Sequence, residues 1–196
     1  MANSSVSALL IVDVQNDFCP GGALPVPHGD LVVPALNRYI AEASARGLPV
    51  YASRDWHPER TTHFAAFGGE WPVHCVQGSN GARFRDDLQL PPSTVVVTKG
   101  ERADHPGYSA FDGHAEDGTG LLSLLKARHV THLFVGGLAT DYCVKHTVLD
   151  ARAAGLNVTV LSDAISGVDV HPGDSVRAMA EMRDAGARLA AGHGLL

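Results

Sequence analysis

Cysteine is scarce in this chain of 196 residues, which has only Cys19, Cys75 and Cys143. An odd number of scattered cysteines does not make a disulfide framework, so the fold is not expected to depend on disulfide bonds. This usage is typical of a reducing compartment, and the cytoplasm is the predicted location.

Long apolar runs and clusters of basic residues are also missing. Residues 1–7 contain no basic residue, and the apolar run 8–12 is too short for the core of a signal peptide. No segment approaches the ~20 apolar residues of a membrane-spanning helix. The formal net charge is -6, which argues against nucleic acid or an anionic membrane as partner. A small-molecule partner is expected instead, with homo-oligomerisation left open.

The composition that remains is that of a globular protein, with 45% hydrophobic and 18% charged residues. The length suits one domain over residues 1–196, and no linker divides it. Apolar runs predict strands, and apolar residues at helical spacing predict helices between them. The strands are expected at 8–14, 48–52, 94–98, 132–135, 157–161 and 187–190, and the helices at 31–46, 120–128, 144–151 and 172–184.

This alternation predicts an α/β fold, with a mostly parallel sheet of about six strands and helices on both faces. Residues 55–92 do not fit the alternation, since they show no clear periodicity and are rich in Gly, His, Pro and aromatic residues. A segment of that length without regular structure in one domain is expected to be functional.

Chemically capable side chains follow four of the expected strands: Asp13, Asp55, Lys99 and Cys143. Ligands of such sheets bind at the carboxyl ends of the strands. A base, a cation and a thiol would share one pocket there, as an activated nucleophile requires. Each residue also has a simpler interpretation, for Asp13 the capping of a loop through backbone N–H groups.

Cys143 lies where a strand turns into a helix. Thr140 or Asp141 is expected to cap that helix, which would place Cys143 in its first turn. The helix dipole would then favour the thiolate, and the small residues Gly136 and Gly137 would let a substrate approach the backbone. The alternative is that Cys143 packs as a small buried hydrophobe.

Asp55, His57, His63 and His74 lie in the irregular segment, and their chemistry suits a divalent transition metal. Asp55 and His57 point the same way if the chain there is extended. His63 is the least certain ligand, and Cys75 is assigned to packing. The alternative is that these histidines are ordinary loop residues.

Four aromatic residues complete the expected site and could line a flat pocket for a planar ligand: Phe18, Trp71, Tyr108 and Tyr142. Taken alone, such residues could equally belong to the core.

Taken together, these motifs resemble the nicotinamidase/pyrazinamidase enzymes of the isochorismatase-like superfamily. The resemblance covers nearly the whole chain and rests on residues 12–18, 55–58, 71–75, 98–100, 108–111 and 137–144. It implies an isochorismatase-like fold and a metal-dependent amidohydrolase. Its substrates would be pyridine carboxamides: nicotinamide and pyrazinamide would be converted to the acids and ammonia through a cysteine thioester.

The resemblance also implies a role for each residue. The catalytic triad would be Asp13, Lys99 and Cys143. The metal ligands would be Asp55, His57 and His74, with His63 serving in some members only, and the ion would be zinc, or alternatively iron or manganese. A cis peptide would join Leu138 to Ala139, and the N–H groups of Ala139 and Cys143 would form an oxyanion hole. The substrate-binding residues would be Phe18, Trp71, Tyr108, Leu138 and Tyr142.

Two other interpretations stay open at this point. One is a different cysteine amidohydrolase of the same superfamily, although the Asp55/His57/His74 set disfavours the carbamoyl-amide enzymes. The other is a non-catalytic metal-binding or redox module, which would not need Lys99 or the oxyanion turn.

Overall fold

The computed structural model describes residues 6–196. Residues 1–5, which the sequence analysis considered in excluding a signal peptide, lie outside the described residues. One six-stranded sheet runs through the molecule in the order β3-β2-β1-β4-β5-β6, and every neighbouring pair is parallel. The strands are β1 Val6–Val12, β2 Val50–Asp55, β3 Val95–Lys99, β4 Val130–Leu138, β5 Asn157–Ser166 and β6 Arg188–Ala190. The predicted six-stranded parallel sheet is confirmed.

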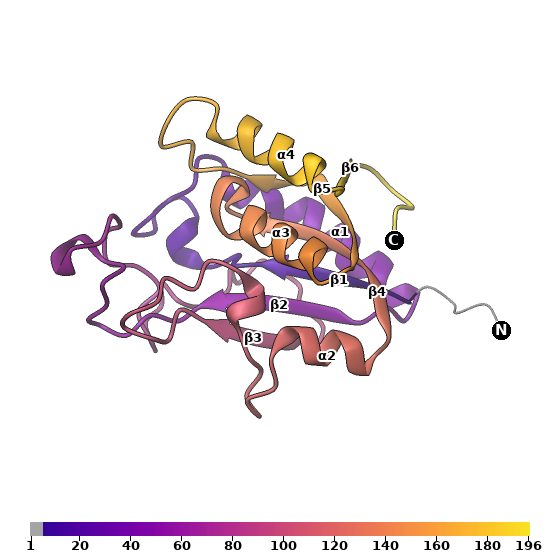
Figure 1. Cartoon of the computed structure of the whole chain (residues 1–196), viewed down its shortest axis with the longest axis horizontal. Coiled ribbons are helices and arrows are strands. Elements are labelled where there is room, and N and C mark those ends of the chain that lie inside the picture. Colours follow the sequence, from indigo (N-terminus) through magenta and orange to yellow (C-terminus); the bar gives the residue numbers. More distant parts are fainter. Residues whose placement is uncertain (1–5) are drawn as a thin grey trace.

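Helices cover both faces of the sheet, as predicted (Figure 1). They are α1 Val32–Ala45, α2 Leu121–Ala127, α3 Lys145–Ala153 and α4 Asp174–Asp184. In β1, Leu9 and Ile11 pack on the α1 side, whereas Leu10 and Val12 pack on the side of the other three helices. Because both faces of β1 are covered, its apolar residues run without polar alternation. The described residues thus form one sheet with a core on each of its faces.

Strand β4 is longer than the predicted 132–135, since Gly136 and Gly137 continue its pairing with β1. A Cβ atom on Gly137 would lie 2.1 Å from the carbonyl oxygen of Val12. This glycine therefore permits the close approach of two strands, which corrects the expectation that it makes room for substrate. Strand β1 ends earlier than predicted, at Val12, because Asp13 turns into the left-handed region at a φ of 48°.

Residues 56–92 contain no α-helix or β-strand, in agreement with the sequence. One short 3-10 turn, Ala65–Phe67, and isolated bridges such as His57 to Val76 organise the segment. The part that carries the histidines lies beyond the carboxyl ends of β2 and β3 (Figure 1). Residues 87–92 run back past α1 to the start of β3. In the part of the chain that the structure describes, no helix combines the length and apolarity needed to cross a membrane.

From the centre of the sheet, β1, β2 and β3 follow one another toward one edge, and β4, β5 and β6 toward the other. The strand order therefore reverses between β1 and β4. In open parallel sheets, ligands bind outside the carboxyl ends of the strands at such a switch point. Asp13 follows β1, and the turn that carries Cys143 follows β4. The topology therefore places the expected nucleophile and base beside the same crevice.

Candidate active site

The four strand-end residues meet around the ammonium group of Lys99. Its Nζ lies 2.8 Å from Asp13 Oδ2 and 3.5 Å from Cys143 Sγ, and it also donates to Asp55 Oδ1. A further hydrogen bond of 2.9 Å runs to the carbonyl oxygen of Gly107. The Lys99 side chain is fully buried, and its two carboxylate partners keep its pKa well above the usual value despite the cost of burial.

The two carboxyl groups beside Lys99 differ in their protonation. Burial raises the pKa of Asp13, and the ammonium of Lys99 offsets this only in part. Burial acts on Asp55 as well, but Lys99 and His57 together outweigh it and hold the pKa of Asp55 well below its usual range. Asp55 is therefore held as an anion, whereas Asp13 is the carboxyl group that takes up a proton more readily.

Cys143 lies in a π-helical turn, Thr140–Val144, that precedes α3, and not in the first turn of an α-helix as predicted. The peptide between Leu138 and Ala139 is cis, as the resemblance implied. Burial raises the pKa of the Cys143 thiol well above its usual value, and the negative charges of Asp13 and Asp55 act in the same direction against Lys99. The prediction that this turn favours the thiolate is therefore wrong for the resting site.

Neither Thr140 nor Asp141 caps the turn with its side chain, so that prediction is also wrong. The carboxylate of Asp141 instead accepts hydrogen bonds from the backbone N–H groups of Val168 and Asp169, at 2.9 and 2.8 Å. Asp141, two residues before the nucleophile, therefore binds the backbone of residues 168 and 169, which follow β5.

Three of the predicted metal ligands form one cluster, since the ring nitrogens of His57, His63 and His74 lie within 4.8 Å of one another. The Nδ1 atom of His57 lies 3.0 Å from the Gly100 carbonyl, and that of His74 lies 2.7 Å from the Pro72 carbonyl. Because a carbonyl only accepts, each Nδ1 carries a proton, and Nε2 is the ring nitrogen left to bind a metal ion. Burial lowers the pKa of His74, and burial together with the other two imidazoles lowers that of His63 to about 3.

The cluster fits a divalent metal ion. His57 Nε2 is buried without a hydrogen-bond partner among the described residues, and it faces Asp55 Oδ2 at 3.7 Å. A buried polar atom without a partner costs free energy, which a bound cation would recover. Three imidazoles and one carboxylate are a donor set that zinc, iron and manganese bind in proteins.

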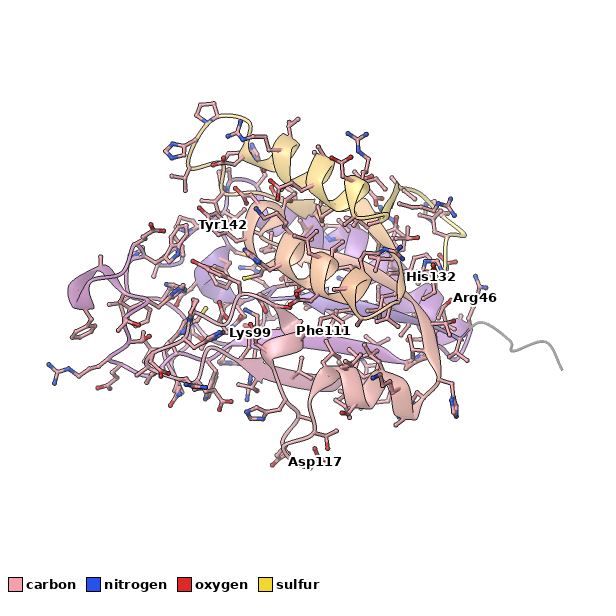
Figure 2. All side chains as sticks on the ribbon, in the orientation of Figure 1. Arg46, Lys99, Phe111, Asp117, His132 and Tyr142 are labelled. Carbon is pink, nitrogen blue, oxygen red and sulfur yellow. The ribbon has the colours of Figure 1, made fainter. Side chains whose placement is uncertain are left out.

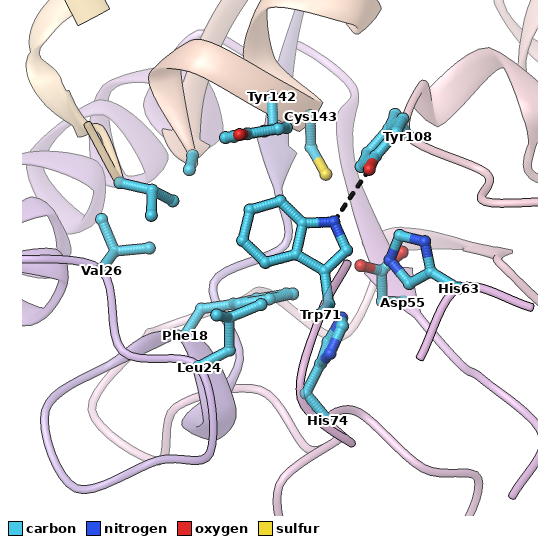
Figure 3. A pocket seen from close by; sticks show the side chains of 12 residues that line it. Phe18, Leu24, Val26, Asp55, His63, Trp71, His74, Tyr108, Tyr142 and Cys143 are labelled. Atoms are coloured by element: carbon cyan, nitrogen blue, oxygen red, sulfur yellow. Dashed lines mark hydrogen bonds between the residues drawn. The ribbon is translucent and has the colours of Figure 1, made fainter. Parts of the chain in front are cut away.

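One cavity joins the thiol to this cluster (Figure 3). Its walls include Phe18, Trp71, Tyr108 and Tyr142, so the predicted aromatic lining is present. Trp71 Nε1 donates to Tyr108 Oη at 2.9 Å. Lys99 and Tyr142 lie at the same end of the sheet, far from His132 and Arg46 (Figure 2).

Leu138 differs from its predicted role in substrate binding. Its side chain is fully buried in the core on the α1 side and does not line the cavity. Leu138 ends a buried strand, and its side chain packs in the core like the other apolar side chains of β4.

Sequence reasoning missed three apolar residues that line the cavity, Leu24, Val26 and Val168, and one polar residue, Ser53. Ser53 Oγ donates to Asp13 Oδ1 at 2.7 Å, and its place two residues before Asp55 on β2 was the available signal. Leu24 and Val26 follow Gly21 and Gly22 in the loop between β1 and α1, where no periodic pattern marks them as ligand-binding residues.

Comparison with known proteins agrees with this geometry. The family model described as "Isochorismatase domain" matches residues 7–193, which is nearly the whole chain. The chain belongs to the isochorismatase family.

Within the isochorismatase family, the chain is similar to characterised amidases. It is 44% identical to the nicotinamidase of Escherichia coli, over 93% of each chain. It is 42% identical to the nicotinamidase/pyrazinamidase of Mycobacterium tuberculosis, over 93% of this chain and 97% of that one. The structure of a Pyrococcus horikoshii pyrazinamidase in complex with zinc superposes with a TM-score of 0.87 at 41% identity, covering 95% of this chain and 99% of that one.

Proposed function

We propose that this protein is a metal-dependent amidohydrolase that converts nicotinamide and pyrazinamide to nicotinate and pyrazinoate, with release of ammonia. The observation that carries the proposal is the cavity lined by the Cys143 thiol, Asp55, His63 and His74. Behind this wall, Lys99 joins the Asp13 carboxyl to Cys143, and His57 completes the histidine cluster. The family membership and the similar nicotinamidases support it.

The reaction begins with Asp13 as base. As the Cys143 sulfur attacks the amide carbon, Asp13 accepts the thiol proton, and a tetrahedral oxyanion forms. When the intermediate collapses, the C–N bond breaks and Asp13 returns the proton to the departing nitrogen, which leaves as ammonia. A water molecule then attacks the thioester with Asp13 as base, and the acid and the free thiol are released.

Lys99 supplies the positive charge of the catalytic group. Since the resting thiol is neutral, its proton moves only while the sulfur–carbon bond forms, and the nearby ammonium stabilises the anionic sulfur. Ser53 holds one oxygen of Asp13, which leaves the other for Lys99 and the thiol proton.

The backbone N–H groups of Ala139 and Cys143 are proposed as the oxyanion hole. One such donor is typically worth about 2.7–4 kcal/mol of transition-state stabilisation. Shifting a thiol pKa from about 8.5 to about 7 would contribute less than ~2 kcal/mol. The oxyanion hole is therefore expected to contribute more to the rate than the thiolate population.

His57, His74, Asp55 and His63 are proposed to hold one divalent metal ion, and zinc is the first candidate because of the zinc-bound pyrazinamidase of similar structure. When bound, the metal supplies a Lewis-acidic site for the ring nitrogen of the substrate. Phe18, Trp71, Tyr108 and Tyr142 hold the planar ring from its sides, which orients the amide carbon toward Cys143.

The proposed compartment is the cytoplasm, supported by three cysteines that are all free. Nicotinate released there would serve the salvage of pyridine nucleotides.

The test is to measure ammonia and pyridine acid with purified protein and either amide, and to acid-quench the reaction for mass spectrometry of the Cys143 peptide. We expect both products, a nicotinoyl adduct on Cys143, loss of activity with a chelator and recovery with zinc. Absence of acid from both amides would overturn the proposal. Activity that persists after elemental analysis shows the metal to be removed would overturn the metal dependence.

A further inference from the structure

Asp141 connects the turn of the nucleophile to the loop that follows β5. Its side chain is buried, and its two carboxylate oxygens accept one hydrogen bond each, from Val168 N and Asp169 N. Hydrogen bonds from backbone N–H groups to a carboxylate are stronger than bonds between neutral groups. Asp141 therefore binds residues 168 and 169 to the peptide segment that carries Cys143.

The same loop is anchored at its far side. Asp169, at a φ of 50°, accepts hydrogen bonds from Ser175 N and Ser175 Oγ, at 2.8 and 2.7 Å. Gly167 fits between these groups, since a Cβ atom there would lie 1.8 Å from Ser175 Oγ and 3.1 Å from Asp141 Oδ1. The loop is thus held between Asp141 and the first turn of α4.

This loop brings Val168 into the cavity wall, together with Leu24 and Val26. Figure 3 shows Val26 at the end of the cavity away from Asp55 and His63. Val168 belongs to the same end, because Ser166 Oγ donates to the carbonyl of Pro27, next to Val26, at 2.7 Å. Leu24, Val26 and Val168 are called the apolar wall below. They offer no polar side chain to a ligand.

We propose that Asp141 is a positioning residue that fixes Val168 in the apolar wall, and that this wall selects pyridine amides by limiting the size of the ring. The inference rests on the proposed function. A ring placed with its nitrogen toward the histidines and its amide carbon toward Cys143 directs carbon 5 toward the opposite end. A methyl group on carbon 5 would contact the apolar wall, whereas an unsubstituted ring fits between the wall and the nucleophile.

Asp141→Asn tests the positioning role, because the amide has the same size but only one oxygen to accept the two N–H groups. We expect the KM for nicotinamide to rise about tenfold, which corresponds to ~1.4 kcal/mol, with a smaller change in kcat. The ratio of kcat/KM for nicotinamide to that for 5-methylnicotinamide is expected to fall at least about fivefold. The matched control is Asp117→Asn, which alters a similar bond from the N–H of Thr119 to a carboxylate oxygen, in a loop outside the cavity. It should change neither value.

Val168→Ala provides a second test that leaves the Asp141 hydrogen bonds in place. It should raise kcat/KM for 5-methylnicotinamide while that for nicotinamide stays within about threefold. An unchanged selectivity ratio in both variants would overturn the inference, as would a change in Asp141→Asn that Asp117→Asn reproduces. If wild-type protein does not hydrolyse nicotinamide, the proposed function fails and the inference fails with it. An active wild type with unchanged variant ratios removes the inference alone.

Discussion

At the scale of single residues, the site separates two tasks that both need a carboxyl group. Asp55 is an anion held by Lys99, suited to bind a cation, whereas the raised pKa of Asp13 suits it to carry a proton. The same burial keeps Cys143 as a thiol at rest. Attack and proton transfer are therefore coupled, and the loss of either partner should stop the reaction.

Cys143→Ala should lower kcat by at least ~10,000-fold, because it removes the one thiol among the described residues that line the cavity. The free energy of unfolding should change by only about 1 kcal/mol, since one buried sulfur atom is removed. Steady-state ammonia release and thermal unfolding of the same preparation check both. Asp13→Asn should be nearly as inactive, and near wild-type turnover in a folded Cys143 variant would exclude the thioester.

His57→Ala should reduce bound metal to well below one equivalent, because it removes the buried Nε2 that has no other partner. Elemental analysis of the purified variant is the measurement. His114→Ala is the matched control, since His114 pairs with Glu101 away from the cluster and should leave the metal content unchanged. Full occupancy in His57→Ala would mean that the ligand set is misassigned.

The lowered pKa of His63 predicts how the metal-free protein responds to acid. The unfolded chain binds a proton at His63 near pH 6.5, but the folded chain does so only near pH 3. Between these values the unfolded state holds more protons, so stability decreases as the pH falls, by up to about 1.4 kcal/mol per pH unit for this residue. In chelated protein, denaturant unfolding should show a shallower decrease for His63→Gln than for wild type. Parallel curves would contradict this.

At the scale of elements, the site depends on how closely β1 and β4 approach. Their carboxyl ends carry Asp13 and the Cys143 turn, and Gly137 lies against Val12 where the two strands end. Any side chain at Gly137 would push apart the two elements that bring the base to the nucleophile.

Gly137→Ala should therefore destabilise the protein by more than ~4 kcal/mol, since the new Cβ meets backbone at 2.1 Å and φ is 126°. Gly155→Ala is the control, because φ is also positive, at 84°, but no atom lies within 4 Å of the added Cβ. That variant should lose only about 1–2 kcal/mol, the cost of a left-handed residue. Equal losses in denaturant unfolding would show that strand approach is not the cause.

At the scale of the whole molecule, two distant segments act on one ring. The histidine cluster comes from the irregular segment after β2, and the nucleophile comes from the turn after β4. A substrate is held in the geometry for attack only if its ring contacts the histidine cluster while its amide reaches Cys143. Substrate specificity therefore depends on both segments together.

Benzamide carries the same carboxamide on a ring without nitrogen, and its kcat/KM should be at least ~100-fold below that of nicotinamide. Pyrazinamide keeps a nitrogen at the matching position and should be accepted. Removal of the metal should shrink the difference, since both rings are then held by Phe18, Trp71 and Tyr108 alone. Similar values for benzamide and nicotinamide in the holoenzyme would overturn the role of the histidines.

The sequence by itself determined the fold class and the principal residues of the site. Apolar runs marked the buried strands, and because parallel strands end at one edge, the polar residues Asp13, Asp55 and Lys99 had to meet there. The histidines were found by their chemistry in a segment without periodicity.

Tertiary structure alone decided the protonation of Cys143, the partners of Asp141 and the apolar wall. The pKa of a buried thiol depends on desolvation and on charges that come from distant parts of the chain, which no local pattern encodes. The sequence predicts that Asp141 caps a helix, but its carboxylate accepts hydrogen bonds from the backbone N–H groups of Val168 and Asp169, which follow β5. Periodicity predicts which face of an element is buried, but only the packed chain decides which side chains meet across a cavity.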